Sequence, residues 1–210
     1  MQSRIKDTGI ELLIVFGIGG LIGTLIAWTS NAYVSGVQFF TALRENHSIF
    51  EITLAGSQFE LTSLIFLWIA AAFVILIRRV FGVVRWHGPA DSIYHAQQSK
   101  EPLDIKHGIA STLTAFTSAA GGGSVGQYGP LVHFGATLGI VVKRFVSSRL
   151  SHEVYLGCGV AAAISAGFGA PIAGIVFAHE AILRHFSVRA IAPISIASVT
   201  ASAVSQAFFS

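Results

Sequence analysis

The first apolar run of the sequence, residues 10–43, constrains the fold more than any other feature. A helix over this run, at about 1.5 Å per residue, is roughly 50 Å long, whereas the hydrocarbon core of a bilayer is about 30 Å thick. Such a helix must tilt or extend beyond the core. Residues 61–84 form a second run that is long enough to cross. Only 11% of the 210 residues are charged, against about 25% in soluble domains, so the sequence predicts a polytopic membrane protein.

The second half of the sequence contains shorter apolar runs that glycine and proline separate. Pro130 and Pro171 each stand directly after such a break, and proline is favoured at the first position of a helix. Broken backbone at membrane depth is tolerated where protein or a water-filled cavity covers it. We therefore expect an all-α fold of tilted and broken helices. Residues 1–210 are expected to form a single transmembrane domain, with residues 44–60 as a polar connection between the first two crossings.

Basic residues gather at alternate ends of the predicted crossings. They are Arg4, Lys6, Arg78, Arg79, Arg85, Lys143, Arg144, Arg149, Arg184 and Arg189. The positive-inside rule assigns these ends to the cytoplasm. It predicts a cytoplasmic N-terminus, seven crossings and an outer position for Ser210. We expect a multi-pass protein of a bacterial inner membrane.

Residues 121–139, GGGSVGQYGPLVHFGATLG, interrupt the apolar pattern with glycines before Pro130. A helix start leaves several amides unpaired and carries a partial positive charge of about half an elementary unit, which favours a bound anion. Glycine-rich turns also occur where helices merely pack, so this break alone is a weak signal. Two further breaks, WHGPADS and GFGAPIAGIVFAHE, strengthen it. Several broken helices that start near one point are typical of a transporter substrate site.

Other function classes find no support in the residue pattern. The net charge of +3 is too small and dispersed for a nucleic-acid partner. Cys158 stands alone and gives neither a disulfide framework nor a metal-ligand spacing. The histidines lack the usual zinc spacings, and we find no nucleophile–base pair. We therefore expect no enzyme, no metal site and no cofactor.

Two linked motifs resemble those of the CLC family of voltage-gated chloride channels and chloride/proton antiporters. GQYGP, residues 126–130, resembles the family signature G-K/R-E-G-P. Residues 159–186, GVAAAISAGFGAPIAGIVFAHEAILRHF, resemble the family segment A-x-x-F-x-A-P-x-x-G-x-x-F-x-x-E. HGPADS, residues 87–92, stands where the family has G-S-G-I-P.

The resemblance implies the N-terminal half of an inverted repeat that transports chloride or a similar anion in a lipid bilayer. It also implies a homodimer once a second half completes the fold, with residues 171–208 contributing to the interface. The positions that it implies for anion binding are Gly88, Pro89, Ala90, Gly126, Gln127, Tyr128 and Gly129.

This chain departs from the family pattern at the residues that decide the mechanism. Tyr128 stands at the gating glutamate, and a tyrosine with an ordinary pKa of about 10 stays neutral at working pH. Ala181 stands where antiporters carry an internal proton glutamate. The selectivity serine of G-S-G-I-P falls on Trp86, and Ser92 lies downstream and out of register. We therefore predict passive anion movement without obligatory proton exchange.

Several residues in the apolar helices have both a structural and a functional interpretation. His133 and His179 are interpreted as packed, hydrogen-bonded histidines, while a proton or ion pathway through His179 and Glu180 is the alternative. Glu180 is expected to pair with Arg184, one helical turn further on. Cys158 is interpreted as a small buried residue. The glycines of the first run, Gly17, Gly19, Gly20 and Gly23, are interpreted as helix-packing positions.

The second-half signature G-x-F-x-P does not occur in these residues. We interpret the chain either as a piece of a longer reading frame or as one half of a complex, and favour the first. A proton-coupled antiporter and a non-conducting membrane scaffold remain alternatives to an anion channel.

Overall fold

The computed structural model describes most of the chain. The described ranges are residues 2–46, 51–54, 57–60, 62–98, 103–146, 148 and 150–209. Arg149 and Ser210, which the predicted topology uses, lie outside them.

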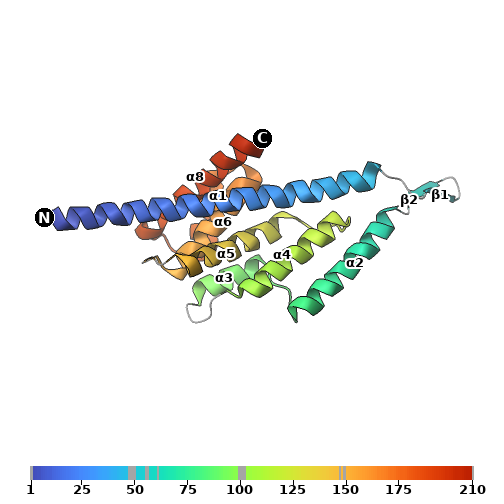
Figure 1. Cartoon of the computed structure of the whole chain (residues 1–210), viewed down its shortest axis with the longest axis horizontal. Coiled ribbons are helices and arrows are strands. Elements are labelled where there is room, and N and C mark those ends of the chain that lie inside the picture. The colour runs from blue at the N-terminus through green and yellow to red at the C-terminus, as the bar shows by residue number, and fades with distance from the viewer. Residues whose placement is uncertain are drawn as a thin grey trace.

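The first half is built from two long helices joined by a small hairpin. Helix α1 (Gln2–Asn46) runs along the length of the molecule and crosses the face of the bundle (Figure 1). Strands β1 (Glu51–Leu54) and β2 (Ser57–Glu60) pair antiparallel beyond its end, and α2 (Thr62–Phe81) returns. These strands lie within residues 44–60, where a polar connection is expected from the sequence, although β1 alternates polar and apolar residues as strands do.

The second half consists mainly of short, broken helices, as the sequence predicts, and ends in the longer helix α8. They are α3 (Pro89–Gln97), α4 (Ile105–Ala120), α5 (Tyr128–Phe145), α6 (His152–Phe168), α7 (Pro171–Phe177), the π-helix η1 (Ala178–Leu183) and α8 (Val188–Phe209). Pro89 and Pro171 are first helical residues, whereas α5 begins two residues before Pro130. The all-α, broken-helix fold class is confirmed.

Three helices in the described part are long and apolar enough to cross a membrane. They span Leu13–Asn46, Thr62–Phe81 and Val188–Phe209. The count of seven crossings stays a prediction.

Helix α6 forms the centre of the bundle. Its residues 154–165 are all buried, and α1, α5, α7 and α8 pack around them. Cys158 is fully buried there, as predicted. The hydroxyl of Ser165 donates to the carbonyl oxygen of Ser198 at 2.6 Å. The hydroxyl of Ser198 donates to the carbonyl oxygen of Pro171 at 2.8 Å. These bonds pair carbonyls near the break between α6 and α7 within the protein.

Helix α1 approaches α8 through two of its four predicted packing glycines. A Cβ on Gly23 would lie 2.5 Å from the carbonyl oxygen of Ala197, and Gly19 is similarly tight. The interpretation is wrong for Gly17 and Gly20, because neither has an atom within 4 Å of such a Cβ. Gly19 and Gly23 are four residues apart and therefore share the helix face that meets α8.

Asp104 caps the start of α4, and we expect its removal to weaken the fold. Its carboxylate accepts hydrogen bonds from the backbone amide of Lys106 at 2.9 Å and from the amide and ring of His107. Burial raises the pKa of Asp104, but the hydrogen bonds from His107 and Lys106 outweigh it and lower the pKa overall. Asp104→Ala should lower the free energy of unfolding by about 1 kcal/mol at neutral pH.

The sign of the pH dependence follows from the lowered pKa of Asp104. Its charge contributes stability above the unfolded value of about 3.9, and the contribution disappears as pH falls through the folded value. Unfolding in mixed micelles, followed by circular dichroism, should therefore show the wild type and D104A converging in acid. D104N keeps the cap acceptor, so it should lose less than D104A. Equal losses in both variants would contradict a capping role.

Candidate functional site

Two helix starts that are far apart in sequence meet inside the structure. A Cβ on Gly129, in the first turn of α5, would lie 3.7 Å from Cγ of Pro89, the first residue of α3. Both helices point their N-termini at this place, so both macrodipoles present their positive ends there. The glycine-proline breaks predicted that three helix starts would meet. Those of α3 and α5 do, whereas Pro171, the first residue of α7, does not line the adjoining cavity.

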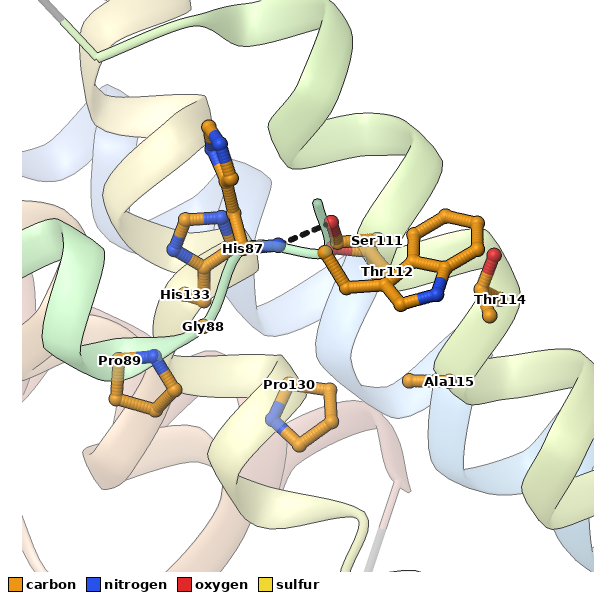
Figure 2. Close-up of a pocket in the computed structure, with 10 residues that line it drawn as sticks. His87, Gly88, Pro89, Ser111, Thr112, Thr114, Ala115, Pro130 and His133 are labelled. Atoms are coloured by element: carbon orange, nitrogen blue, oxygen red, sulfur yellow. Dashed lines mark hydrogen bonds between the residues drawn. The ribbon is translucent and has the colours of Figure 1, made fainter. Parts of the chain in front are cut away.

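A cavity of about 200 Å³ lies beside these starts. Figure 2 shows Pro89 and Pro130 on one side of it and the hydroxyl residues of α4 across from them. The cavity is lined by Trp86, His87, Gly88, Pro89, Ser111, Thr112, Thr114, Ala115, Pro130 and His133. Of the predicted anion-binding residues, only Gly88 and Pro89 line it. Its walls therefore combine apolar surface with a small number of hydroxyl and imidazole groups.

The start of α3 offers fewer free amides than the sequence suggests. The Gly88 amide donates to a carboxylate oxygen of Asp91 at 2.8 Å, and the other oxygen pairs with Arg85. Pro89 has no amide hydrogen. The amides of Asp91 and Ser92 donate back to the Gly88 carbonyl oxygen. Within the described part of the chain, the Ala90 amide is thus the unpaired donor in this first turn.

The start of α5 keeps more of its donors. The amides of residues 126–129 make no hydrogen bond to any described residue. Pro130 has no amide hydrogen, and the amide of Leu131 donates to the Gln127 carbonyl oxygen. No side chain caps this helix start. Gly126 and Tyr128 are exposed and Gln127 and Gly129 are half-buried, so the free amides of this turn are open to an external acceptor.

Three cavity-lining side chains contain buried polar atoms that have no partner among the described residues. They are Nδ1 of His87, Oγ1 of Thr114 and Nε2 of His133. The backbone amide of His87 donates to the Ser111 hydroxyl at 2.8 Å, the bond drawn in Figure 2. Burial lowers the pKa of His87, and Asp91 opposes this shift only in part. The residues that line the cavity thus contribute unmet hydrogen-bonding capacity from the segment before α3, from α4 and from α5.

His133 is a packed, hydrogen-bonded histidine, as predicted, but it also lines the cavity. Its side chain is 1% exposed, and its Nδ1 lies 2.7 Å from the hydroxyl oxygen of Ser92. Ser92 is itself fully buried. Although out of register with the selectivity serine, it reaches the site through this histidine.

Tyr128, at the predicted gating position, lies next to the cavity without lining it. Its ring stacks on Phe168 with a centroid separation of 4.2 Å. A Cβ on Gly167 would lie 3.3 Å from the same ring. The phenol therefore packs against the end of α6, and 37% of the residue is exposed.

His179 and Glu180, the predicted proton or ion pathway, do not line the cavity. His179 is 1% exposed, bonds through Nδ1 to the Ile175 carbonyl oxygen at 3.0 Å and stacks on Phe186. It is a packed histidine, as predicted. Glu180 is exposed.

The predicted pair between Glu180 and Arg184 is wrong for the described structure. Arg184 adopts a left-handed conformation with φ of 57°, ends η1, and directs its guanidinium to the side-chain oxygen of Gln97 at 3.5 Å. The π-helical turn and this ending remove the regular spacing on which the predicted pair depends.

Sequence reasoning missed the contribution of α4. Ser111 and Thr114 lie three residues apart, which places them on one face of a helix. That spacing was a usable signal, but nothing in the sequence showed which helix would face it. The described residues contain no group of three or more His, Cys, Asp or Glu side chains that could hold a metal ion.

Comparisons with known proteins agree with this architecture. Residues 67–210 match the family model described as "Voltage gated chloride channel". A ClcB-like protein of Ralstonia nicotianae is 30% identical over 112 residues, which cover 51% of this chain and 26% of that protein. The voltage-gated ClC-type chloride channel ClcB of Escherichia coli is 24% identical over 138 residues, covering 66% and 33%.

The fold also matches a solved structure. A crystal structure of a CLC-type fluoride/proton antiporter gives a TM-score of 0.75 at 24% identity, covering 95% of this chain and 48% of that one. The chain thus spans a quarter to a third of the curated relatives' length and about half of the solved one. Because the family model matches more than half of its residues, the chain belongs to the voltage-gated chloride channel family.

Proposed function

We propose that this chain is the N-terminal half of a CLC-type protein that moves chloride or a similar anion across a membrane. One observation carries the proposal: the starts of α3 and α5 meet beside a cavity that contains buried, unpaired polar atoms. Two converging helix dipoles and free amides stabilise a negative charge. The family membership supports the same ligand class.

Transport by this site is passive. Tyr128 stands in place of the gating carboxylate, and its ring is held against Phe168. Ala181 has no ionisable group, and Glu180 is exposed and does not line the cavity. A proton-coupled cycle needs groups that exchange protons near working pH, and neither family position supplies one.

The complete transporter contains a second, inverted half that supplies the remaining anion ligands. Inverted repeats place the substrate near the midplane between the halves. In this arrangement the N-terminus is cytoplasmic, residues 1–210 form one transmembrane domain, and two completed copies form a homodimer in a bacterial inner membrane. The cycle requires no cofactor and no enzymatic step.

Chloride efflux from liposomes tests the proposal. Vesicles that contain the assembled protein should release chloride on addition of an ionophore that balances charge, with no accompanying proton uptake. Chloride-driven proton uptake, recorded with a pH electrode, would instead identify an antiporter. An assembly that releases no more chloride than empty vesicles would identify the non-conducting scaffold.

A further inference from the structure

We propose that His133 is the side chain that donates a hydrogen bond to the anion, and that Ser92 positions it by selecting its tautomer. This inference rests on the proposed function, because it assumes that the cavity between the starts of α3 and α5 receives the anion. The ligand class is a monovalent anion of the size of chloride or bromide.

His133 has a ring nitrogen whose hydrogen-bonding capacity is unmet. The residue is 1% exposed, and its Nε2 has no partner among the described residues. A buried polar atom of this kind is costly unless a ligand or water pairs with it. Since His133 lines the cavity, a molecule held there is the available partner.

The contact with Ser92 determines which ring nitrogen of His133 carries the proton. The Ser92 hydroxyl is fully buried, and Nδ1 of His133, 2.7 Å away, is its hydrogen-bond partner within the described structure. If Nδ1 carried the proton, the serine hydrogen would lack an acceptor. Ser92 therefore donates to Nδ1, and the neutral ring carries its proton on Nε2. The unpaired nitrogen of this cavity-lining residue is then a donor, which suits an anion.

The charged groups around the His133 ring leave room for an anion. The groups that act on His133 electrostatically are His87 in the segment before α3, and Asp91 and His95 on α3. Asp91 is the one acid among them, and its oxygens are occupied by Arg85 and the Gly88 amide. The α4 side of the cavity contributes the hydroxyls of Ser111, Thr112 and Thr114 rather than charge. The start of α3 adds the positive end of a dipole.

His179 provides a matched control for the burial of a histidine. It is also 1% exposed, bonds through Nδ1 and leaves Nε2 without a partner in the described structure. It differs from His133 in not lining the cavity. A general effect of replacing a buried histidine should appear equally at both positions.

The experiment is a sodium bromide titration of the purified chain in lipid nanodiscs, followed by ¹⁵N NMR of the histidine rings. The wild-type His133 ring should show the Nε2–H tautomer, and its Nε2 signal should shift as bromide saturates the site. H133F should weaken bromide binding by roughly tenfold to a hundredfold, whereas H179F should bind as the wild type does. S92A should show a mixture of tautomers and an intermediate affinity.

Two results would overturn the inference: an Nδ1–H tautomer in the wild-type ring, or unchanged bromide affinity in folded H133F. If H133F does not fold, the wild-type tautomer and the S92A titration decide the question, since neither needs that variant. Bromide binding through His133 without chloride efflux by the assembly would refute the proposed function but not this inference. If chloride efflux and bromide binding both persist in H133F, this inference is refuted and the proposed function is not.

Discussion

Gly159→Ala is expected to destabilise the protein by about 3 kcal/mol or more, because α5 and α6 touch backbone to backbone at this residue. A Cβ on Gly159 would lie 2.1 Å from the carbonyl oxygen of Gly135, and one on Gly135 would lie 2.5 Å from that of Gly159. The contact repeats one turn away, where a Cβ on Gly139 would lie 2.2 Å from the Tyr155 carbonyl oxygen. Overpacking a core already costs 1–3 kcal/mol when flexible side chains give way, and here the obstacle is backbone.

A shift of α5 in this variant would also disturb the candidate site, because α5 contributes both its first turn and His133 to that site. Unfolding of the purified protein by increasing dodecyl sulfate, followed by circular dichroism, should show a large loss for G159A. Gly20→Ala is the matched control, since a Cβ at Gly20 meets nothing within 4 Å and alanine favours a helix. If G159A and G20A unfold alike, the close approach of α5 and α6 is not a source of stability.

Tyr128→Glu is expected to weaken anion binding by about tenfold or more at pH 7.5, in an acid-reversible way. A glutamate at the start of α5 has an ordinary pKa of about 4.3 and is ionised at that pH. Its carboxylate can accept hydrogen bonds from the unpaired amides of residues 126–129 and repel a second anion. Those hydrogen bonds and the helix dipole lower the pKa of the carboxyl group below its ordinary value, so the competition ends and binding recovers only as the pH falls to about 3.

Bromide titration of the variant at pH 7.5 and about pH 3 provides the measurement. Tyr128→Phe keeps the ring that stacks on Phe168 and should bind bromide as the wild type does at both pH values. Tyr128→Gln separates charge from lost packing, because it has no carboxylate to titrate. Equal effects of Y128E and Y128Q at both pH values would show that packing, not charge, is responsible.

Local sequence patterns determined which segments are helical and where they break. Apolar runs and the residues Pro89 and Pro171 gave the helices and their starts, because helix propensity and proline geometry act within a few residues. The same reasoning predicted three helix starts near one point, and the structure brings together those of α3 and α5. It missed the hairpin of β1 and β2, where a four-residue alternation was too short to stand out within a polar connection.

Packing between distant segments decided the rest. The sequence could not show that the Asp91 carboxylate would accept a hydrogen bond from the Gly88 amide. It also could not show that Arg184 would bond to Gln97 and not to Glu180. It also gave no means to separate Gly19 and Gly23, which face α8, from Gly17 and Gly20, which do not.

The sequence by itself therefore determined the class of protein, the helical segments and the residue types at the family positions. Only the tertiary structure decided that hydroxyls of α4 and the ring of His133 line the cavity, and that Tyr128 packs beside it. The physical reason is that a helix start is a local property of the chain. A partner for an unpaired group depends on which other helices are packed against it.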